Sequence, residues 1–201
     1  MIFYKLTYDM DSIDQLNKEG KSYIYAEETN LEEIEYPGVK KGFFSNIIFK
    51  ELDSIDWPDV KFYYSSKASN RESDYLLNVN RWPVVHKRVK AALERENIDG
   101  IRFYGISLCD VVTGQINTNY YVMYIENFID AFDLAKSKYK YNEEYDAYFF
   151  MPKQTFFNIE NCQEYDIFRC SKSVVGIYVS EKFYNIIKKN GFTCFYFDRQ
   201  P

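Results

Sequence analysis

The residue best suited to catalysis is the single histidine of the chain, His86. A neutral imidazole can act as a general base near neutral pH if a carboxylate or a nucleophile lies within hydrogen-bond reach. No serine or cysteine close to His86 in the sequence would form a dyad with it, and its place at a predicted helix start is explained by capping. An acid such as Asp130 could complete a pair in the folded chain, so an enzyme acting on a small substrate stays open as an alternative.

A second possible chemistry is cation binding by Glu126, Asp130 and Asp133. Loops that bind hard cations supply more oxygen ligands at closer spacing, and usually a glycine at the bend. We therefore interpret these three carboxylates as a solvated strand end with a helix cap, and we expect no metal here.

Cysteine and glycine patterns indicate neither a metal nor a cofactor. The chain has eight glycines and no glycine-rich phosphate loop, and it lacks nucleophile-elbow and zinc-protease motifs. None of the cysteines belongs to a C-x-x-C pair, and their spacing fits no zinc site. We expect all four to be reduced and partly buried. They are Cys109, Cys162, Cys170 and Cys194.

The surface feature with the clearest functional meaning is a run of glutamates near the N-terminus. Its five acids fall within nine residues, with no base among them. Such a run is most often simply solvated, but on a small protein it can also steer a basic partner at a high association rate. The residues proposed for partner binding are Glu27, Glu28, Glu32, Glu33 and Glu35.

Charge and hydropathy narrow the class of partner. Residues 1–60 contain 13 acids and 6 bases, whereas residues 61–201 contain 17 acids and 19 bases. The net charge of −5 at pH 7 argues against a nucleic-acid partner, which needs a basic surface. The short basic and aromatic stretch Lys136–Tyr141 is interpreted as a solvated face. No run of 18 apolar residues and no signal-peptide pattern is present, so we expect a cytoplasmic protein without a membrane partner.

Two stretches that must position these side chains share one pattern. Residues 85–103 align without a gap on residues 179–197, at an offset of 94 residues. Each has a polar starter, apolar positions at helical spacing, an Asn/Gly break and an alternating strand. We expect helices at His86–Glu96 and Ser180–Asn190, each capped by its first residue. The strands that follow are expected at Ile101–Leu108 and Phe192–Phe197.

The remaining sequence is rich in strand-forming residues, with 20 tyrosines and 17 phenylalanines. The strongest strand is expected at Asn119–Phe128 and the first at residues 2–8. Residues 42–49 form either a short strand or a buried segment, and Asp9–Gly20 either a short helix or a loop. Short turns predict antiparallel hairpins between three compact strands. These strands are Ala147–Met151, Thr155–Ile159 and Tyr165–Arg169.

Together these elements predict an α+β fold with a mainly antiparallel sheet and two equivalent helix–strand modules. We expect a single domain over residues 1–201, with a variable acidic N-terminal part (1–75) and a core (76–201) that holds the internal repeat. A two-lobed arrangement, with one module in each lobe, is the alternative. The polar stretch Lys67–Ser73 is expected to be an exposed loop.

Three motifs follow one another in the C-terminal two-thirds of the chain. A long strand is followed by N-F-I-D-A-F-D, then by I-F-R, then by V-S-E-K at the second helix. In this order the motifs resemble a bacterial immunity-protein family of polymorphic toxin systems, formerly a domain of unknown function. The resemblance covers about residues 76–197, and His86 departs from it by standing where the family usually has serine. The matching residues are Asn127, Ile129, Asp130, Asp133, Ser137, Ile167, Phe168, Arg169, Val179, Ser180, Glu181 and Lys182.

The resemblance implies a cytoplasmic protein that binds and neutralises a cognate toxin, with no catalysis and no cofactor. A basic toxin would suit the glutamates at 27–35. Two other interpretations stay open: a small-substrate enzyme that uses His86 and a carboxylate such as Asp130 between the modules, and a structural partner in a larger assembly. A deep pocket enclosing His86 and a carboxylate would favour the enzyme, whereas a flat acidic face would count against it.

Overall fold

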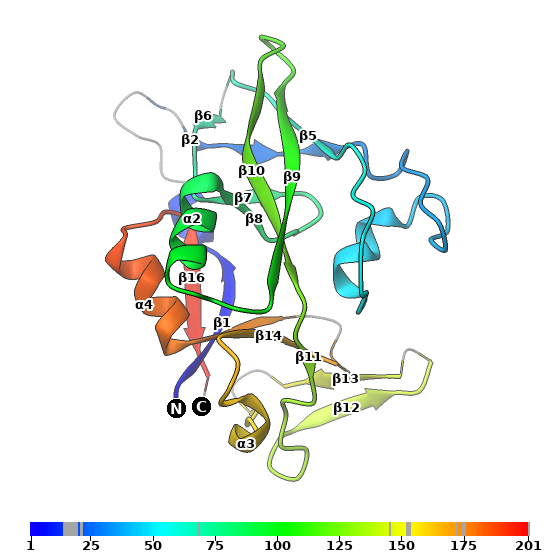
Figure 1. The fold of residues 1–201 in the computed structure, drawn as a ribbon, viewed down its shortest axis with the longest axis vertical. Coiled ribbons are helices and arrows are strands. Elements are labelled where there is room, and N and C mark those ends of the chain that lie inside the picture. The colour runs from blue at the N-terminus through cyan, green and yellow to red at the C-terminus, as the bar shows by residue number, and fades with distance from the viewer. Residues whose placement is uncertain are drawn as a thin grey trace.

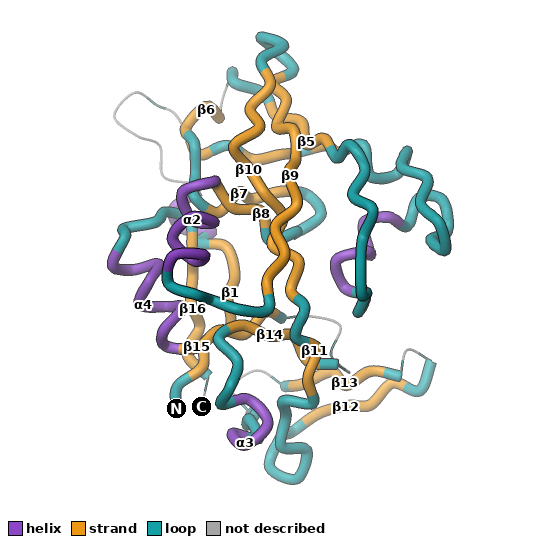
Figure 2. The backbone as a smooth tube through the Cα atoms, in the orientation of Figure 1, coloured by secondary structure: helices purple, strands orange, loops and turns teal. Residues whose placement is uncertain are grey.

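The computed structural model describes residues 1–13, 20, 22–67, 69–144, 146–151, 154–171, 173 and 176–200 of the chain. Strands make up most of the regular structure, and the helices are short (Figures 1 and 2). The architecture is α+β, as the sequence predicts. The first strand, β1 (Phe3–Tyr8), pairs with the last, β16 (Phe195–Arg199), so the two ends of the chain lie side by side.

Most strands belong to two sheets. The seven-stranded sheet has, in spatial order, β3 (Tyr25–Ala26), β7 (Tyr75–Asn78), β8 (Val84–His86), β10 (Ile116–Ile125), β9 (Ile101–Asp110), β5 (Lys61–Tyr64) and β4 (Glu28–Thr29). The five-stranded sheet has β11 (Phe128–Ile129), β14 (Ile167–Cys170), β15 (Ile177–Ser180), β1 and β16. Two small ribbons pair β12 (Tyr139–Asn142) with β13 (Ala147–Phe150), and β2 (Ser22–Tyr23) with β6 (Ser69–Arg71). The helices are α1 (Met10–Ile13), the 3-10 helix η1 (Phe44–Phe49), α2 (Lys87–Arg95), α3 (Ile159–Cys162) and α4 (Glu181–Lys189).

Both larger sheets are mixed, which refines the expectation of a mainly antiparallel sheet. The pairs β3–β7, β5–β9 and β11–β14 are parallel, and they lie toward the sheet edges. The other pairs of these two sheets are antiparallel, including the outer pairs β4–β5 and β1–β16. The β12–β13 ribbon is antiparallel as well.

Five strands of one sheet match the other sheet in order, direction and register. The order β3-β7-β8-β10-β9 corresponds to β11-β14-β15-β1-β16, and in both the first pair is parallel and the next three are antiparallel. Val85 pairs with Tyr121 of β10, and its counterpart Val179 pairs with Tyr4 of β1. The N-terminal strand therefore occupies in the second unit the place that β10 occupies in the first.

The two helices begin and end by the same devices. The Nδ1 atom of His86 accepts a hydrogen bond from the first turn of α2, and the Ser180 hydroxyl accepts one from Phe183 N in α4 at 3.3 Å. The breaks after the helices use left-handed backbone at matching places, 94 residues apart. These residues are Asn97 (φ 51°) and Gly100 (φ 79°) in the first unit, and Gly191 (φ 64°) and Cys194 (φ 67°) in the second.

The surroundings of the two units differ. The strand after α2 is ten residues long and pairs on its far side with β5, whereas the five-residue β16 ends its sheet. Both helices nevertheless pack into one core between the sheets (Figure 1). That core includes Val89 and Leu93 of α2 with Phe183 and Ile187 of α4, each at most 1% exposed.

The C-terminal hairpin prediction is wrong: two of its three strands exist, as β13 and β14, but neither pairs with another of the three. Residues 155–159 form no strand, because Phe157 is buried against Phe132, with ring centroids 5.4 Å apart, and residue 159 already begins α3. The strand at 147–150 pairs instead with the basic and aromatic stretch that becomes β12. Residues 44–49 form a 3-10 helix that buries Phe44, Ile47 and Ile48. The polar stretch Lys67–Ser73, expected to be a loop, contains β6. The Asp9–Gly20 question lies partly outside the described residues.

Candidate functional site

The acidic segment, residues 27–35, runs along the edge of the seven-stranded sheet beside β5. Glu28 pairs with Tyr63, and the side chain of Asn30 accepts a hydrogen bond from Lys61 N at 2.8 Å. Leu31, 1% exposed, anchors the turn in the core below. Because the segment is held by its backbone and by Leu31, its acidic side chains are free to face the solvent. Glu27, Glu28, Glu32, Glu33 and Glu35 are all exposed.

The charge of this segment is largely uncompensated. Of its five glutamates, Glu35 alone forms an ion pair within the described part of the chain, with Lys41 at 3.0 Å. Both side chains of that pair are more than 70% exposed, so the pair contributes little to stability. Among the described residues, then, no ion pair offsets the other four carboxylates.

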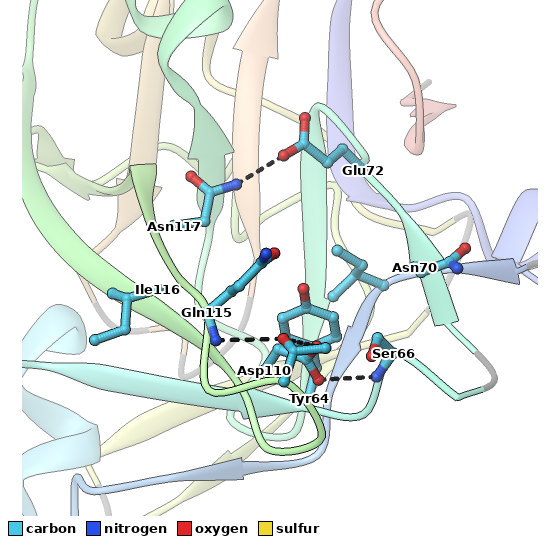
Figure 3. A pocket seen from close by; sticks show the side chains of 10 residues that line it. Tyr64, Ser66, Asn70, Glu72, Asp110, Gln115, Ile116 and Asn117 are labelled. Atoms are coloured by element: carbon cyan, nitrogen blue, oxygen red, sulfur yellow. Dashed lines mark hydrogen bonds between the residues drawn. The ribbon is translucent and has the colours of Figure 1, made fainter.

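A polar pocket of about 390 Å³ adjoins the start of the acidic segment (Figure 3). In the register of β4 on β5, Glu27 comes opposite Tyr64, which lines the pocket. None of the lining residues is basic, and the nearby Arg71 lies 4.0 Å over the ring of Tyr23. The walls come from four separate stretches of the chain. They are Ile24, Tyr64 and Ser66, Asn70 and Glu72, and the turn between β9 and β10 with Asp110, Thr113, Gln115, Ile116 and Asn117.

The floor of the pocket carries a fixed negative charge at Asp110, which is 3% exposed. Its Oδ1 accepts hydrogen bonds from Ser66 N at 3.1 Å and Val112 N at 3.0 Å, and its Oδ2 accepts one from the Thr113 hydroxyl at 2.5 Å. Burial alone would raise the pKa of Asp110, but these hydrogen bonds outweigh it and hold the pKa well below its usual range. The carboxyl group therefore stays ionised at every physiological pH.

Two further groups make the pocket suited to a cation. Glu72 is exposed, and its carboxylate accepts a hydrogen bond from Asn117 at 2.7 Å. The pKa of Tyr64 is raised by burial and then by the charges of Asp110 and Glu72. A guanidinium or ammonium group would find two carboxylates and several amide oxygens here, and no competing base.

Above the pocket, the β9–β10 hairpin ends in an apolar tip that projects from the molecule (Figure 1). Val111, Val112 and Ile116 are 62%, 45% and 63% exposed. An apolar rim next to charged groups is the usual composition of a protein interface, in which apolar contact supplies affinity and charge supplies orientation.

The structure explains His86 as a helix cap. Its Nδ1 accepts a hydrogen bond from Arg88 N at 3.4 Å, and its ring packs edge-on against Tyr120. Partial burial lowers its pKa. The neighbouring carboxylate of Asp74 is fully buried and already bound by Arg88 and by Thr193. The Asp74 carboxylate is therefore not available to His86 as a catalytic partner.

Asp130 lies in the other sheet, after β11, and the polar pocket is lined by neither His86 nor Asp130. Asp133 accepts from the backbone of the turn that follows and pairs with Lys136 at 2.7 Å, while Glu126 pairs with Arg102 at 2.6 Å. These carboxylates are thus satisfied separately, as a strand end and a cap.

No group of three metal-ligating side chains comes together among the described residues. No disulfide joins the four cysteines, and three of them are buried. Burial raises the pKa of Cys162 to about 12 and that of Cys170 well above its usual range, so neither has the character of a nucleophile. None of the described helices combines the length and the apolar character needed to cross a membrane.

Sequence reasoning located the acidic segment but not the pocket beside it. Thr113-Gly114 marks the hairpin turn in the sequence, yet nothing there indicates that Asp110 would meet Ser66 and Tyr64 from other strands. The useful signal is an aspartate placed just before the turn of a hairpin, where it can accept from the turn backbone.

Comparison with known proteins identifies the chain at the level of a family. A model of the immunity protein family, Imm11, matches residues 3–200. The match therefore includes the acidic segment and all the pocket residues, beyond the range of the sequence motifs noted above. No curated protein matches the chain.

Proposed function

Since the chain belongs to the immunity protein family Imm11, we propose that it binds a cognate bacterial toxin and neutralises it without catalysis. The family match, which spans nearly the whole chain, is the observation that carries this proposal. Toxin neutralisation by binding needs a stable surface and no turnover, and the separate placement of His86, Asp130 and Asp133 is compatible with that.

We place the toxin-binding surface at the acidic segment and the adjoining pocket. The glutamates at 27, 28, 32, 33 and 35 attract a basic toxin over a distance of about a Debye length, roughly 8–10 Å at physiological salt. A lysine or arginine of the toxin then enters the pocket between Glu72 and Asp110, while the hairpin tip covers apolar toxin surface. A few such anchors suffice for a non-obligate interface of standard size.

The same proposal assigns the other parts of the chain. Residues 1–201 form one domain, supported by the position of β1 inside the sheet of the C-terminal strands. The acidic N-terminal part, residues 1–75, carries partner choice, and the two helix–strand modules are equivalent supports. Such a protein acts in the cytoplasm of a bacterium with a polymorphic toxin system, and needs neither nucleic acid nor membrane.

The test is the association rate with the toxin encoded beside this chain's gene. Reversing the charge of Glu28, Glu32 and Glu33 to lysine should slow association by at least roughly tenfold at low salt, because steering is the main contribution of exposed charges. The loss should shrink toward 1 M salt, where the Debye length falls to about 3 Å.

The matched control reverses the charge of three exposed glutamates in the C-terminal half of the chain, Glu143, Glu144 and Glu160. Both triple variants change the net charge equally, so the control isolates position from total charge. An association rate, and a salt dependence, that are the same for the two variants would show that the acidic segment is not the toxin-binding surface.

A further inference from the structure

Among the described residues, the guanidinium of Arg169, in β14, is a buried positive charge with an unsatisfied donor. Arg169 is 6% exposed, and its Nε has no hydrogen-bond partner. Within the described part of the chain no carboxylate lies within ion-pair distance of it. A buried guanidinium with an unsatisfied N–H and no carboxylate beside it among these residues is a destabilising arrangement, so it calls for an explanation.

Aromatic groups surround the guanidinium. The ring of Phe49 lies over it at 4.9 Å from the centroid. Burial lowers the pKa of Arg169 to about 10, and the phenols of Tyr75 and Tyr124, rather than a carboxylate, are what oppose that shift. A cation–π contact with one phenylalanine offsets only part of the desolvation of an arginine.

The fold itself does not require an arginine at this place. In the matching register of the two sheets, Arg169 pairs with Phe128 on the parallel edge strand β11, as Leu77 pairs with Tyr25 on β3. The first unit thus builds the same position from leucine. Arg169 therefore places a charge, with an unsatisfied Nε–H, where the first unit has an apolar side chain.

Phe49 covers one face of the guanidinium. This residue ends η1 and is itself 38% exposed. The chain just beyond it is held by Tyr124, whose hydroxyl donates to Lys50 O at 2.7 Å and accepts from Leu52 N at 2.9 Å. The Phe49 ring that covers the guanidinium is thus partly exposed to solvent, next to a backbone held in place at residues 50–52.

We propose that Arg169 is an oxyanion-binding site, closed by the Phe49 ring, which receives one carboxylate or phosphate group. The unpaired Nε–H and the adjacent Nη form the edge of the guanidinium that binds two oxygens of such a group side-on. The site differs from the toxin-binding surface proposed above in both place and sign, since it is positive and lies on the other sheet. The oxyanion comes either from a free small molecule or from an acidic side chain of the bound toxin.

The first experiment measures thermal unfolding with and without inorganic phosphate, at constant ionic strength set by chloride. Phosphate at ten times its dissociation constant should raise the Tm of the natural protein by about 4 °C. Arg169→Met, which removes the charge at similar volume, should lose that shift. Arg95→Met is the matched control, because Arg95 is a largely exposed arginine paired with Glu96, and it should keep the shift.

A second measurement guards against misfolding of Arg169→Met. The Nε–H resonance of Arg169 is followed by NMR in the natural protein during the phosphate titration. It should move with the same dissociation constant that the Tm data give. A bound anion changes this resonance, whereas a purely structural arginine leaves it unmoved.

The toxin distinguishes the two sources of the oxyanion. If an acidic side chain of the toxin enters the site, Arg169→Met lowers toxin affinity at least tenfold and phosphate competes with the toxin. If the ligand is a free anion, phosphate binds without competing. The proposal is overturned if phosphate shifts neither the Tm nor the Nε–H resonance and Arg169→Met binds the toxin as the natural protein does. The charge-reversal test at residues 28, 32 and 33 does not involve this site, so either proposal can fail alone.

Discussion

Removal of the Asp74 carboxylate should weaken the contact between the two units and lower the free energy of unfolding, because this carboxylate bonds residues of both units. Asp74 is fully buried just before β7, and its Oδ2 accepts hydrogen bonds from Thr193 N at 2.8 Å and from the Thr193 hydroxyl at 3.0 Å. Thr193 lies in the loop between α4 and β16, so these bonds join the first unit to the second. Arg88 binds the same carboxylate, with Nη2 2.6 Å from Oδ2.

The expected cost follows from these contacts. Two hydrogen bonds to a buried carboxylate contribute about 1.5–3 kcal/mol each, with the lower end appropriate when both come from one residue. The Arg88 side chain is 59% exposed, so its ion pair adds at most about 1 kcal/mol. Asp74→Ala should thus lower the free energy of unfolding by about 3–4 kcal/mol, and the Tm by about 10 °C for a chain of this size.

The second unit offers the matched comparison. Asp166 occupies the corresponding place, and its carboxylate accepts from the Ser180 hydroxyl at 2.7 Å and from Lys182 at 2.7 Å, but its side chain is 23% exposed. Asp166→Ala should cost only about 1–2 kcal/mol. Urea unfolding followed by tryptophan fluorescence gives both values. Equal losses for the two variants, or a loss below about 1 kcal/mol for Asp74→Ala, would refute the idea that Asp74 joins the halves.

Two further predictions concern the ends of α2. Burial lowers the pKa of His86, so the stability that its neutral form contributes is fully present above the unfolded pKa of about 6.5 and is lost as the pH falls through the folded pKa. His86→Ser should keep the helix cap and remove this loss of stability at low pH. The measurement is the Tm of both proteins at pH 5.5 and 7.5. Gly100→Ala should cost about 1–2 kcal/mol more than Gly114→Ala in urea unfolding. Both glycines have positive φ, but only at Gly100 would the added Cβ lie 1.9 Å from the Asn127 side chain, which donates to Ile167 O at 2.9 Å. Equal costs would mean that Asn127 moves aside freely.

The helix–strand units were predictable because their signals are local. Apolar spacing, a capping residue and an Asn/Gly break lie within about twenty consecutive residues. The structure has its helix caps and its left-handed residues at or next to the positions that these signals indicate. The wider correspondence of five strands was not predictable from the repeat, since β1 stands at the other end of the chain from the strands it joins. Residues 155–159 show the opposite error: a strand-like composition that instead buries Phe157 against Phe132.

The candidate sites also differ in whether local sequence signals could reveal them. The five glutamates at 27–35 fall within nine residues, so a composition count finds them and only their exposure needed the structure. The pocket beside them depends on Tyr64, Glu72 and Asp110, which meet only through strand pairing. Arg169 was visible as part of a motif, but no local pattern tells that its guanidinium is buried with an unsatisfied Nε–H.

The central claim, neutralisation by binding, is tested most directly by titrating the cognate toxin's activity with this protein. Stoichiometric binding predicts that activity falls linearly and reaches background at one equivalent, with the same end point at short and long incubation times. Suppression of the toxin by far less than one equivalent, growing with time, would indicate catalysis and contradict the account. So would full toxin activity in the presence of excess protein.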